Sequence, residues 1–341
     1  MAPKIFITGG TGYIGGTVLD TIVKKHPEYE ITALLRSEPE DFAKTYPNVK
    51  VVRGDYDSAD VLSEAASKAD VVVHNGNSDH VPSIKALIDG SLKSDKPTFL
   101  LHLSGTGLIA DWRDPSWVGK LNPKTWSDVD DIREITTRPD GELHRHVDKI
   151  ILAAAQQHGE KLKTAIICPP DIYGPGRGLK NKHTVYFPVF LKEIEKIGRP
   201  FYGNEGENVR SWVHIEDLMK VYRGLVESAV AGGEGADWGV DGYYFAATQS
   251  HSQRFLAERV AAILGTTATS ISSEEIDKTM AAFGVPHLGT YMFGANSRSK
   301  ADRAGKNFGY EASAPGLWEV LEEEVRAAAR LERISFQGHT F

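Results

Sequence analysis

The chain of 341 residues contains a single cysteine, Cys168. One cysteine excludes an intrachain disulfide and favours a reducing compartment. Cys168 lies in the apolar run TAIICPP, so we interpret it as a core residue rather than a reactive thiol.

Long apolar runs and clusters of positive charge are also missing. No stretch approaches the roughly 20 apolar residues that span a bilayer. The run KIFIT begins at Lys4, so we expect no cleavable leader. The formal net charge is -7, and no Lys/Arg run stands out, so neither nucleic acid nor a membrane is expected as a partner.

No HExxH motif or Cys/His cluster indicates a metal. We expect a cytoplasmic protein without a metal site.

Short apolar runs rich in β-branched residues alternate with amphipathic segments in the first half of the chain. Six runs follow this pattern: KIFIT, YEITALL, VKVVRG, ADVVVHNG, TFLLHLSG and KTAIICP. Such alternation predicts parallel strands joined by crossover helices. Residues 1–170 are therefore predicted to form an α/β domain, a Rossmann-type doubly wound parallel sheet.

The alternation stops at PPDIYGPGRGLKNKH, which is rich in turn formers. Residues 171–341 are predicted to form mainly a smaller mixed α/β substrate-binding lobe, with segments near 210–230 and 240–265 returning to the first domain. The expected elements are strands at SWVHI and GYYFAA and helices at residues 187–197, 216–230, 252–264 and 317–331.

The stretch TGGTGYIGG places glycines at three-residue spacing between the first strand and the first helix. Gly9 is expected to make the tight turn, Gly12 to let the backbone approach a pyrophosphate, and Gly15 to allow close packing of helix on strand. Thr11, Tyr13 and Ile14 belong to the same turn. The motif predicts a dinucleotide cofactor.

The residue after the second strand selects between the two nicotinamide dinucleotides. An acidic side chain there accepts a hydrogen bond from the adenosine ribose hydroxyl, whereas a basic side chain pairs with a 2′-phosphate. Arg36 stands there, which favours NADP(H) over NAD(H). The alternative is a surface pair with Glu38 or Glu40. Asp55 is a candidate for the adenine amino group or a turn-forming residue, and Asn75 lines the dinucleotide or an ordinary loop.

These motifs resemble the extended short-chain dehydrogenase/reductase superfamily, which includes nucleotide-sugar epimerases and dehydratases. The resemblance rests on TGGTGYIGG, GDYD, LSGT, PPDIYGPG and VRSWVHIEDL, in that order, and covers about residues 4 to 331. It implies a tyrosine as general acid or base, a lysine four residues later, and a serine or threonine that orients the substrate oxygen. It also implies a homodimer as one possible assembly.

The tyrosine is missing from this chain. The family pattern puts the lysine at Lys149 and the tyrosine position at Arg145, and no tyrosine occurs in residues 57–172. Three readings stay open: His146 or His144 donates the proton, Arg145 stabilises an oxyanion as a fixed cation, or the helix contacts the cofactor through Lys149 and does no chemistry.

Candidate residues for the substrate follow the fifth strand and line the second lobe. Ser104 and Thr106 lie where open α/β sheets bind ligands. Asp79 and His80 follow the fourth strand without a recognisable partner. The resemblance assigns a nucleotide-sugar diphosphate to a second-lobe set that consists of Tyr173, Gly174 and Arg210, to which Arg177, Lys180, Lys182 and Arg298 add positive charge.

The leading hypothesis is an atypical NADP(H)-dependent oxidoreductase or epimerase-like enzyme that acts on a small carbonyl or hydroxyl compound. The alternative is an NmrA-like redox sensor that binds the dinucleotide and a regulatory protein partner without catalysis. A lyase or isomerase that uses the dinucleotide structurally is the third possibility.

Overall fold

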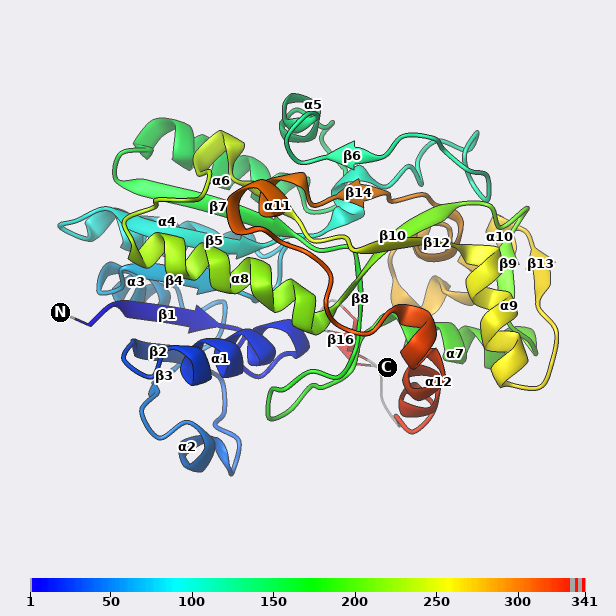
Figure 1. Ribbon diagram of the computed structural model, residues 1–341, viewed down its shortest axis with the longest axis horizontal. Coiled ribbons are helices and arrows are strands. Elements are labelled where there is room, and N and C mark those ends of the chain that lie inside the picture. The colour runs from blue at the N-terminus through cyan, green and yellow to red at the C-terminus, as the bar shows by residue number, and fades with distance from the viewer. Residues whose placement is uncertain (1, 332–334, 337–338, 341) are drawn as a thin grey trace.

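The computed structural model describes residues 2–331, 335–336 and 339–340, and Figure 1 shows it as two parts side by side. The larger part, on the left, is built on one broad sheet. The smaller part, on the right, combines short strands with helices. None of the helices in the described ranges is long and apolar enough to cross a bilayer.

The broad sheet has seven parallel strands in the order β11-β7-β5-β4-β1-β2-β3. Every residue of β4 and β5 is buried, the pattern of strands covered on both faces. This confirms the predicted fold class and all six predicted runs. The strands are β1 (Lys4–Thr8), β2 (Glu30–Leu35), β3 (Lys50–Arg53), β4 (Val71–His74), β5 (Thr98–Leu103), β7 (Leu162–Cys168) and β11 (Tyr243–Phe245).

Two layers of helices cover this sheet because each helix buries one apolar stripe against it. Helices α1 and α8 pack on one face, and α3, α4 and α6 pack on the other. The bounds are α1 (Tyr13–Lys25), α2 (Phe42–Thr45), α3 (Ala59–Ser67), α4 (Val81–Lys93), α5 (Ile132–Thr136), α6 (Arg145–His158), α8 (Ile215–Val230) and α11 (Asp302–Phe308).

The smaller part has its own core, in which Trp212 and Tyr186 meet edge to face at 4.8 Å. Its helices are α7 (Tyr186–Ile197), α9 (Gln253–Ile263), α10 (Ser273–Thr279) and α12 (Leu317–Ala328), with shorter helical turns at Ala281–Phe283 and Thr290–Gly294. Two further turns, Thr106–Ile109 and Gly239–Asp241, pack in the larger part. The remaining strands are β6 (Trp126–Ser127), β8 (Asp171–Tyr173), β9 (Phe201–Gly203), β10 (Val209–His214), β12 (Gln249–Ser252), β13 (Thr269–Ile271), β14 (Ser299–Lys300), β15 (Ser335–Phe336) and β16 (His339–Thr340). The helices and strands predicted for the second half are confirmed, except that α12 ends at Ala328, before the predicted end at residue 331.

The two parts meet along the carboxyl ends of the parallel strands. In Figure 1 the arrow of β1 points toward the smaller part, and its neighbours run parallel to it. Helix α8 returns from the second half of the chain to pack on α1, and β11 adds an edge to the broad sheet. This edge is where open α/β sheets place their ligands.

Candidate active site

The turn between β1 and α1 has the conformation that its glycines allow. Gly9 has φ +73°, a region that favours glycine, and a Cβ there would lie 2.2 Å from the Asn75 carbonyl oxygen. A Cβ at Gly15 would lie 2.4 Å from the Gly9 carbonyl oxygen. Apart from chain neighbours, a Cβ at Gly12 would approach only that same oxygen. The space beside Gly12 at the start of α1 is therefore open, which suits an anionic group.

Asn75 adds a polar group to this turn. It is 7% exposed, and both Oδ1 and Nδ2 of its side chain are buried without a hydrogen-bond partner among the described residues. An amide left unpaired in the interior costs free energy. The open turn and this amide fit a dinucleotide, which would satisfy the donor and the acceptor.

The other residues of the predicted cofactor turn have structural contacts as well. The Tyr13 hydroxyl donates to the Gly174 carbonyl oxygen at 2.6 Å and so ties the turn to the second half of the chain. The Thr11 carbonyl oxygen accepts from the Asn181 amide at 3.3 Å. Ile14 packs on the core between the sheet, α1 and α8.

Arg36 is exposed directly after β2, and it makes no hydrogen bond or ion pair with another described residue. Glu38 instead pairs with Arg53 at 3.0 Å. Asp55 caps the turn before α3: its Oδ1 accepts from the Ser58 hydroxyl at 2.7 Å, and these hydrogen bonds lower the pKa of Asp55. The prediction that Asp55 forms a turn therefore has a geometric basis. The guanidinium of Arg36 is not paired with any other residue that the structure describes.

The start of α6 differs from the predicted register. Lys149 pairs with Asp140 at 2.7 Å on the surface, and Nε of Arg145 donates to the Arg138 carbonyl oxygen at 2.8 Å. His146 is about half exposed. The predicted pair Arg145 and Lys149 therefore does not meet Ser104, because both side chains turn to other partners.

His144, at the residue before α6, takes the place next to β5. Its Nδ1 lies 3.1 Å from Oδ1 of Asp79 and 3.2 Å from the Ser78 hydroxyl. Its Nε2 faces Gly105, at 3.1 Å from the position of an added Cβ, and has no hydrogen-bond partner among the described residues. Burial lowers the pKa of His144, but the hydrogen bond and charge of Asp79 outweigh burial and raise it overall.

Asp148, one helical turn after His144, lies beneath it. Oδ2 of Asp148 accepts from the hydroxyls of Ser104 and Tyr243, each at 3.0 Å, and Oδ1 is buried without a hydrogen-bond partner in the described part of the chain. Burial raises the pKa of Asp148 to about 6, against the opposing charge of His144 and the two hydrogen bonds. Ser104 thus points toward a buried acid.

The raised pKa makes stability depend on pH in a definite sense. The Asp148 contribution is fully present below its ordinary pKa of 3.8 and is lost as the pH rises through about 6. The difference between these two pKa values corresponds to about 3 kcal/mol of folding free energy, and roughly half of this free energy is lost between pH 5 and pH 8. Asp148→Asn should therefore gain stability relative to the unaltered protein between pH 5 and pH 8, measured by urea unfolding. Asp217→Asn, which removes a buried carboxylate paired with Lys220, should show no such gain; equal pH trends in both variants would contradict the assignment.

The predicted substrate residues form hydrogen bonds or ion pairs with other residues of the chain. Thr106 is buried and its carbonyl oxygen accepts from Ser297 at 2.9 Å. The Tyr173 hydroxyl donates to the Pro315 carbonyl oxygen at 2.8 Å. Arg210 is 4% exposed and forms a two-point pair with Asp171 at 2.6 and 3.2 Å. Arg210 is therefore neutralised within the fold.

Of the cations predicted to add positive charge, Arg177 is paired with carboxylates and Arg298 contacts backbone carbonyl oxygens. Arg177 pairs with Asp20 at 3.2 Å and with Glu216 at 3.0 Å. Arg298 donates to the carbonyl oxygens of Asn122 and Pro123. The geometry does not gather these cations around one anion.

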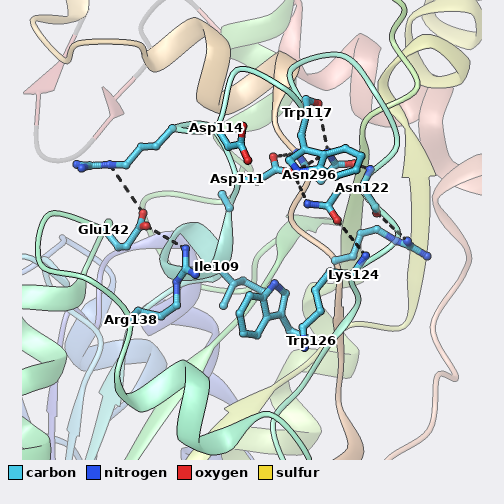
Figure 2. A pocket seen from close by; sticks show the side chains of 13 residues that line it. Ile109, Asp111, Asp114, Trp117, Asn122, Lys124, Trp126, Arg138, Glu142 and Asn296 are labelled. Atoms are coloured by element: carbon cyan, nitrogen blue, oxygen red, sulfur yellow. Dashed lines mark hydrogen bonds and ion pairs between the residues drawn. The ribbon is translucent and has the colours of Figure 1, made fainter.

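Two cavities open in the smaller part. The polar cavity, about 280 Å³, lies between β6 and the loop at residues 109–114. Figure 2 shows two pairs of polar side chains that face each other: Arg138 donates to Glu142 at 2.9 Å, and Asn296 donates to Asp111 at 2.9 Å. The apolar cavity, about 800 Å³, is bounded by residues 112–118, 141–143, 273–277 and 285–291. No cluster of three potential metal ligands occurs in the ranges that the structure describes.

Sequence reasoning missed the roles of Asp79, Asp148 and Tyr243 in this cluster. A signal was present: Asp148 stands between Val147 and Ile151 in the buried stripe of α6. A carboxylate in such a stripe needs a partner. His144 and Asp148 also keep the four-residue spacing, one position earlier than the predicted pair.

Known proteins resemble this chain in both halves. The model of the NmrA-like family matches residues 1–100, and that of the NAD dependent epimerase/dehydratase family matches residues 117–240. Oxidase ucsJ of Acremonium sp is 29% identical over 96% of this chain and 98% of its own length. A dTDP-glucose 4,6-dehydratase of Mycobacterium tuberculosis is 22% identical over 66% of this chain and 69% of its own length.

Solved structures share the fold along almost the entire chain. The dTDP-glucose 4,6-dehydratase of Bacillus anthracis, in complex with NAD, has a TM-score of 0.62 at 15% identity and covers 97% of this chain and 98% of its own. DesIV of Streptomyces venezuelae, also a dTDP-glucose 4,6-dehydratase, has a TM-score of 0.64 at 17% identity, with 95% and 96% covered. The strand order, the glycine turn and both family matches agree that the chain is similar to the extended short-chain dehydrogenase/reductase superfamily, although it has no tyrosine in helix α6, which follows the fifth strand.

Proposed function

We propose that this protein is an NADP(H)-dependent oxidoreductase that acts on a small carbonyl or hydroxyl compound and uses His144 in place of the missing tyrosine. One observation carries the proposal: Asp79 holds Nδ1 of His144, while Nε2 faces the carboxyl end of β5 and has no hydrogen-bond partner among the described residues. A carboxylate on one ring nitrogen fixes the tautomer and leaves the other nitrogen to exchange a proton. The likeness to an oxidase over nearly the full chain supports the same reaction class.

The cofactor would be held by residues at the carboxyl ends of β1, β2 and β4. The backbone from Gly9 to Gly15 would face the pyrophosphate, the Asn75 amide would pair with the dinucleotide, and Arg36 would bind the 2′-phosphate. When bound, the nicotinamide supplies a hydride to a carbonyl carbon or accepts one from a carbinol carbon.

His144 would manage the proton that accompanies the hydride. In the reducing direction the imidazolium Nε2–H donates to the carbonyl oxygen as that oxygen gains charge, and the product is an alcohol. The neutral ring keeps its Nδ1–H on Asp79 and regains a proton from water. In the oxidising direction Nε2 takes the hydroxyl proton. Asp148 accepts a hydrogen bond from the Ser104 hydroxyl. It would position the Ser104 hydroxyl and would not touch the substrate itself.

The cofactor preference is testable at Arg36. Arg36→Ala should weaken NADPH binding by about tenfold, since a charge-assisted contact with phosphate is lost, and should leave NADH binding unchanged. Fluorescence titration with both dinucleotides measures this. Arg53→Ala is the matched control, because Arg53 lies on the neighbouring strand and pairs with Glu38. Equal losses for NADPH and NADH in Arg36→Ala would count against the 2′-phosphate assignment.

A redox sensor without catalysis is the second candidate, favoured by the NmrA-like match of residues 1–100 and the missing tyrosine. It predicts NADPH binding with no turnover of any carbonyl in a broad panel and a protein partner whose binding depends on the nicotinamide state. NADPH oxidation with even one panel member, lost in His144→Gln, would favour the enzyme.

A further inference from the structure

The apolar cavity of the smaller part has no assigned role in the proposed reaction. It encloses about 800 Å³, within the range of small-molecule sites. Apolar side chains from separate segments meet in its wall, namely Trp112, Val118, Leu143, Val285, Leu288 and Tyr291. A ligand in this cavity would bury mostly apolar surface.

The inner wall of this cavity reaches the proposed reaction site. Leu143 directly precedes His144 and, with Tyr291, packs on Gly107. A Cβ at Gly107 would lie 3.0 Å from Leu143 Cδ1 and 3.1 Å from the Tyr291 hydroxyl oxygen. Gly107 is two residues beyond Gly105, which His144 faces. Burial is the main cause that raises the pKa of Tyr291, and the Asp79 charge adds to it, as expected for neighbours.

The charges of the cavity wall do not suit a diphosphate. Its carboxylates, Glu274 and Asp277, outnumber its guanidinium, Arg113, which lies 4.6 Å from the ring centre of Trp112 and donates to the Gly141 carbonyl oxygen. A diphosphate is bound by cations that are free to pair with it. Arg210, the residue assigned to that role by resemblance, is already paired with Asp171.

We infer that the apolar cavity is the substrate pocket and that the substrate is a largely apolar carbonyl or hydroxyl compound, not a nucleotide sugar. The inference rests on the proposed function for the identity of the reacting group. The apolar body lies against Trp112, Val285 and Leu288, and its oxygen points past Leu143 toward Nε2 of His144. Apolar contact supplies the affinity, and the few polar groups at the inner end set the orientation.

The test compares 4-alkyl acetophenones of increasing chain length with UDP-glucose and dTDP-glucose, with binding measured in the presence of saturating NADP⁺, which cannot reduce the ketone. Binding is measured by isothermal titration calorimetry, and turnover is measured separately by NADPH absorbance. The dissociation constants should fall by roughly fourfold for each added methylene while the cavity has room. Neither nucleotide sugar should bind or displace the ketones.

A charge placed in the cavity provides the second measurement. Val285 is half-buried in its wall, and Val285→Arg should weaken binding of the longest ketone by at least about tenfold, because the chain must then contact a hydrated cation. NADPH binding should be unchanged. Val240→Arg is the matched control, since Val240 is 40% exposed in a turn outside the cavity.

Failure of this inference and failure of the proposed function give different results. Chain-length-dependent binding that Val285→Arg abolishes supports the pocket, whether or not turnover follows. Absence of turnover with such binding overturns the oxidoreductase alone. Three results contradict the assignment of this cavity as the substrate pocket: binding that does not depend on chain length, equal effects of Val285→Arg and Val240→Arg, and tighter binding of a nucleotide sugar.

Discussion

Replacing His144 with glutamine is expected to lower kcat for NADPH-dependent carbonyl reduction by about 10²- to 10⁴-fold, the usual contribution of a positioned general acid. Glutamine keeps a hydrogen-bonding side chain of similar reach, but it cannot release a proton at neutral pH. The measurement is the steady-state rate of NADPH oxidation with the best carbonyl substrate, and NADPH binding should be retained. His146→Gln is the control, because His146 is about half exposed, with Nε2 at 3.0 Å from the Asp79 carbonyl oxygen and Nδ1 at 3.9 Å from Asp79 Oδ1.

The pH profile separates a proton donor from a structural residue. Reduction requires protonated His144, so kcat/KM should fall as the pH rises through the pKa of His144, which Asp79 raises above its ordinary value. Asp79→Asn removes the charge that causes this rise, so the falling limb should move to lower pH. A limb that stays in place in Asp79→Asn, or a His144→Gln variant with normal kcat, would contradict the assignment.

The second large effect is expected from Gly15→Ala, which should weaken NADPH binding by about 10- to 100-fold. A Cβ at this position would lie 2.4 Å from the Gly9 carbonyl oxygen and 2.9 Å from Asn75 Cβ, so the turn has to move. Accommodating such a clash costs about 1–3 kcal/mol, and each 1.4 kcal/mol corresponds to tenfold in affinity. Calorimetry with NADPH measures the weaker binding, and the melting temperature without NADPH measures the loss of stability at the turn.

Alanine in place of a helical glycine ordinarily stabilises a protein by roughly 0.5–1 kcal/mol, so the expected loss at Gly15 opposes the helix propensity. Gly305→Ala in α11 is the matched control. There a Cβ would come no closer than 4.0 Å to the Tyr310 carbonyl oxygen, and we expect an equal or higher melting temperature with unchanged NADPH binding. A Gly15→Ala variant that behaves like Gly305→Ala would show that the close packing at the turn is not needed.

The broad sheet could be predicted because its signal is local. Strands such as Val71–His74 are buried on both faces and therefore read as continuous apolar runs. The glycine turn could be predicted equally well. The φ of +73° at Gly9 and the lack of space for a Cβ at Gly15 both restrict these positions to glycine.

The proposed reaction site could be predicted only in part, because it depends on the rotation of one helix. A shift of one residue turns each side chain by about 100°, which is enough to exchange Arg145 and Lys149 for His144 and Asp148. The family pattern fixes a spacing and does not fix this rotation in a chain that lacks the tyrosine. The start of α6 is also unusual: His144 has φ +66°, which a sequence pattern does not reveal.

Pairing between distant segments was the other feature outside the reach of sequence patterns. Asp171 and Arg210 come from β8 and the adjacent β10 and neutralise each other in the interior. Asp79 and His144 are 65 residues apart. Residue type alone leaves a charged side chain available to a ligand, and only the fold decides whether another part of the chain already binds it.

The most direct test of the central claim is a crystal structure with bound NADPH. The account predicts Nε2 of His144 facing the reacting side of the nicotinamide next to Gly105, with Asp79 still on Nδ1 and Lys149 still paired with Asp140. A nicotinamide that lies away from Gly105, or a Lys149 side chain turned onto the nicotinamide ribose with His144 out of reach, would contradict it.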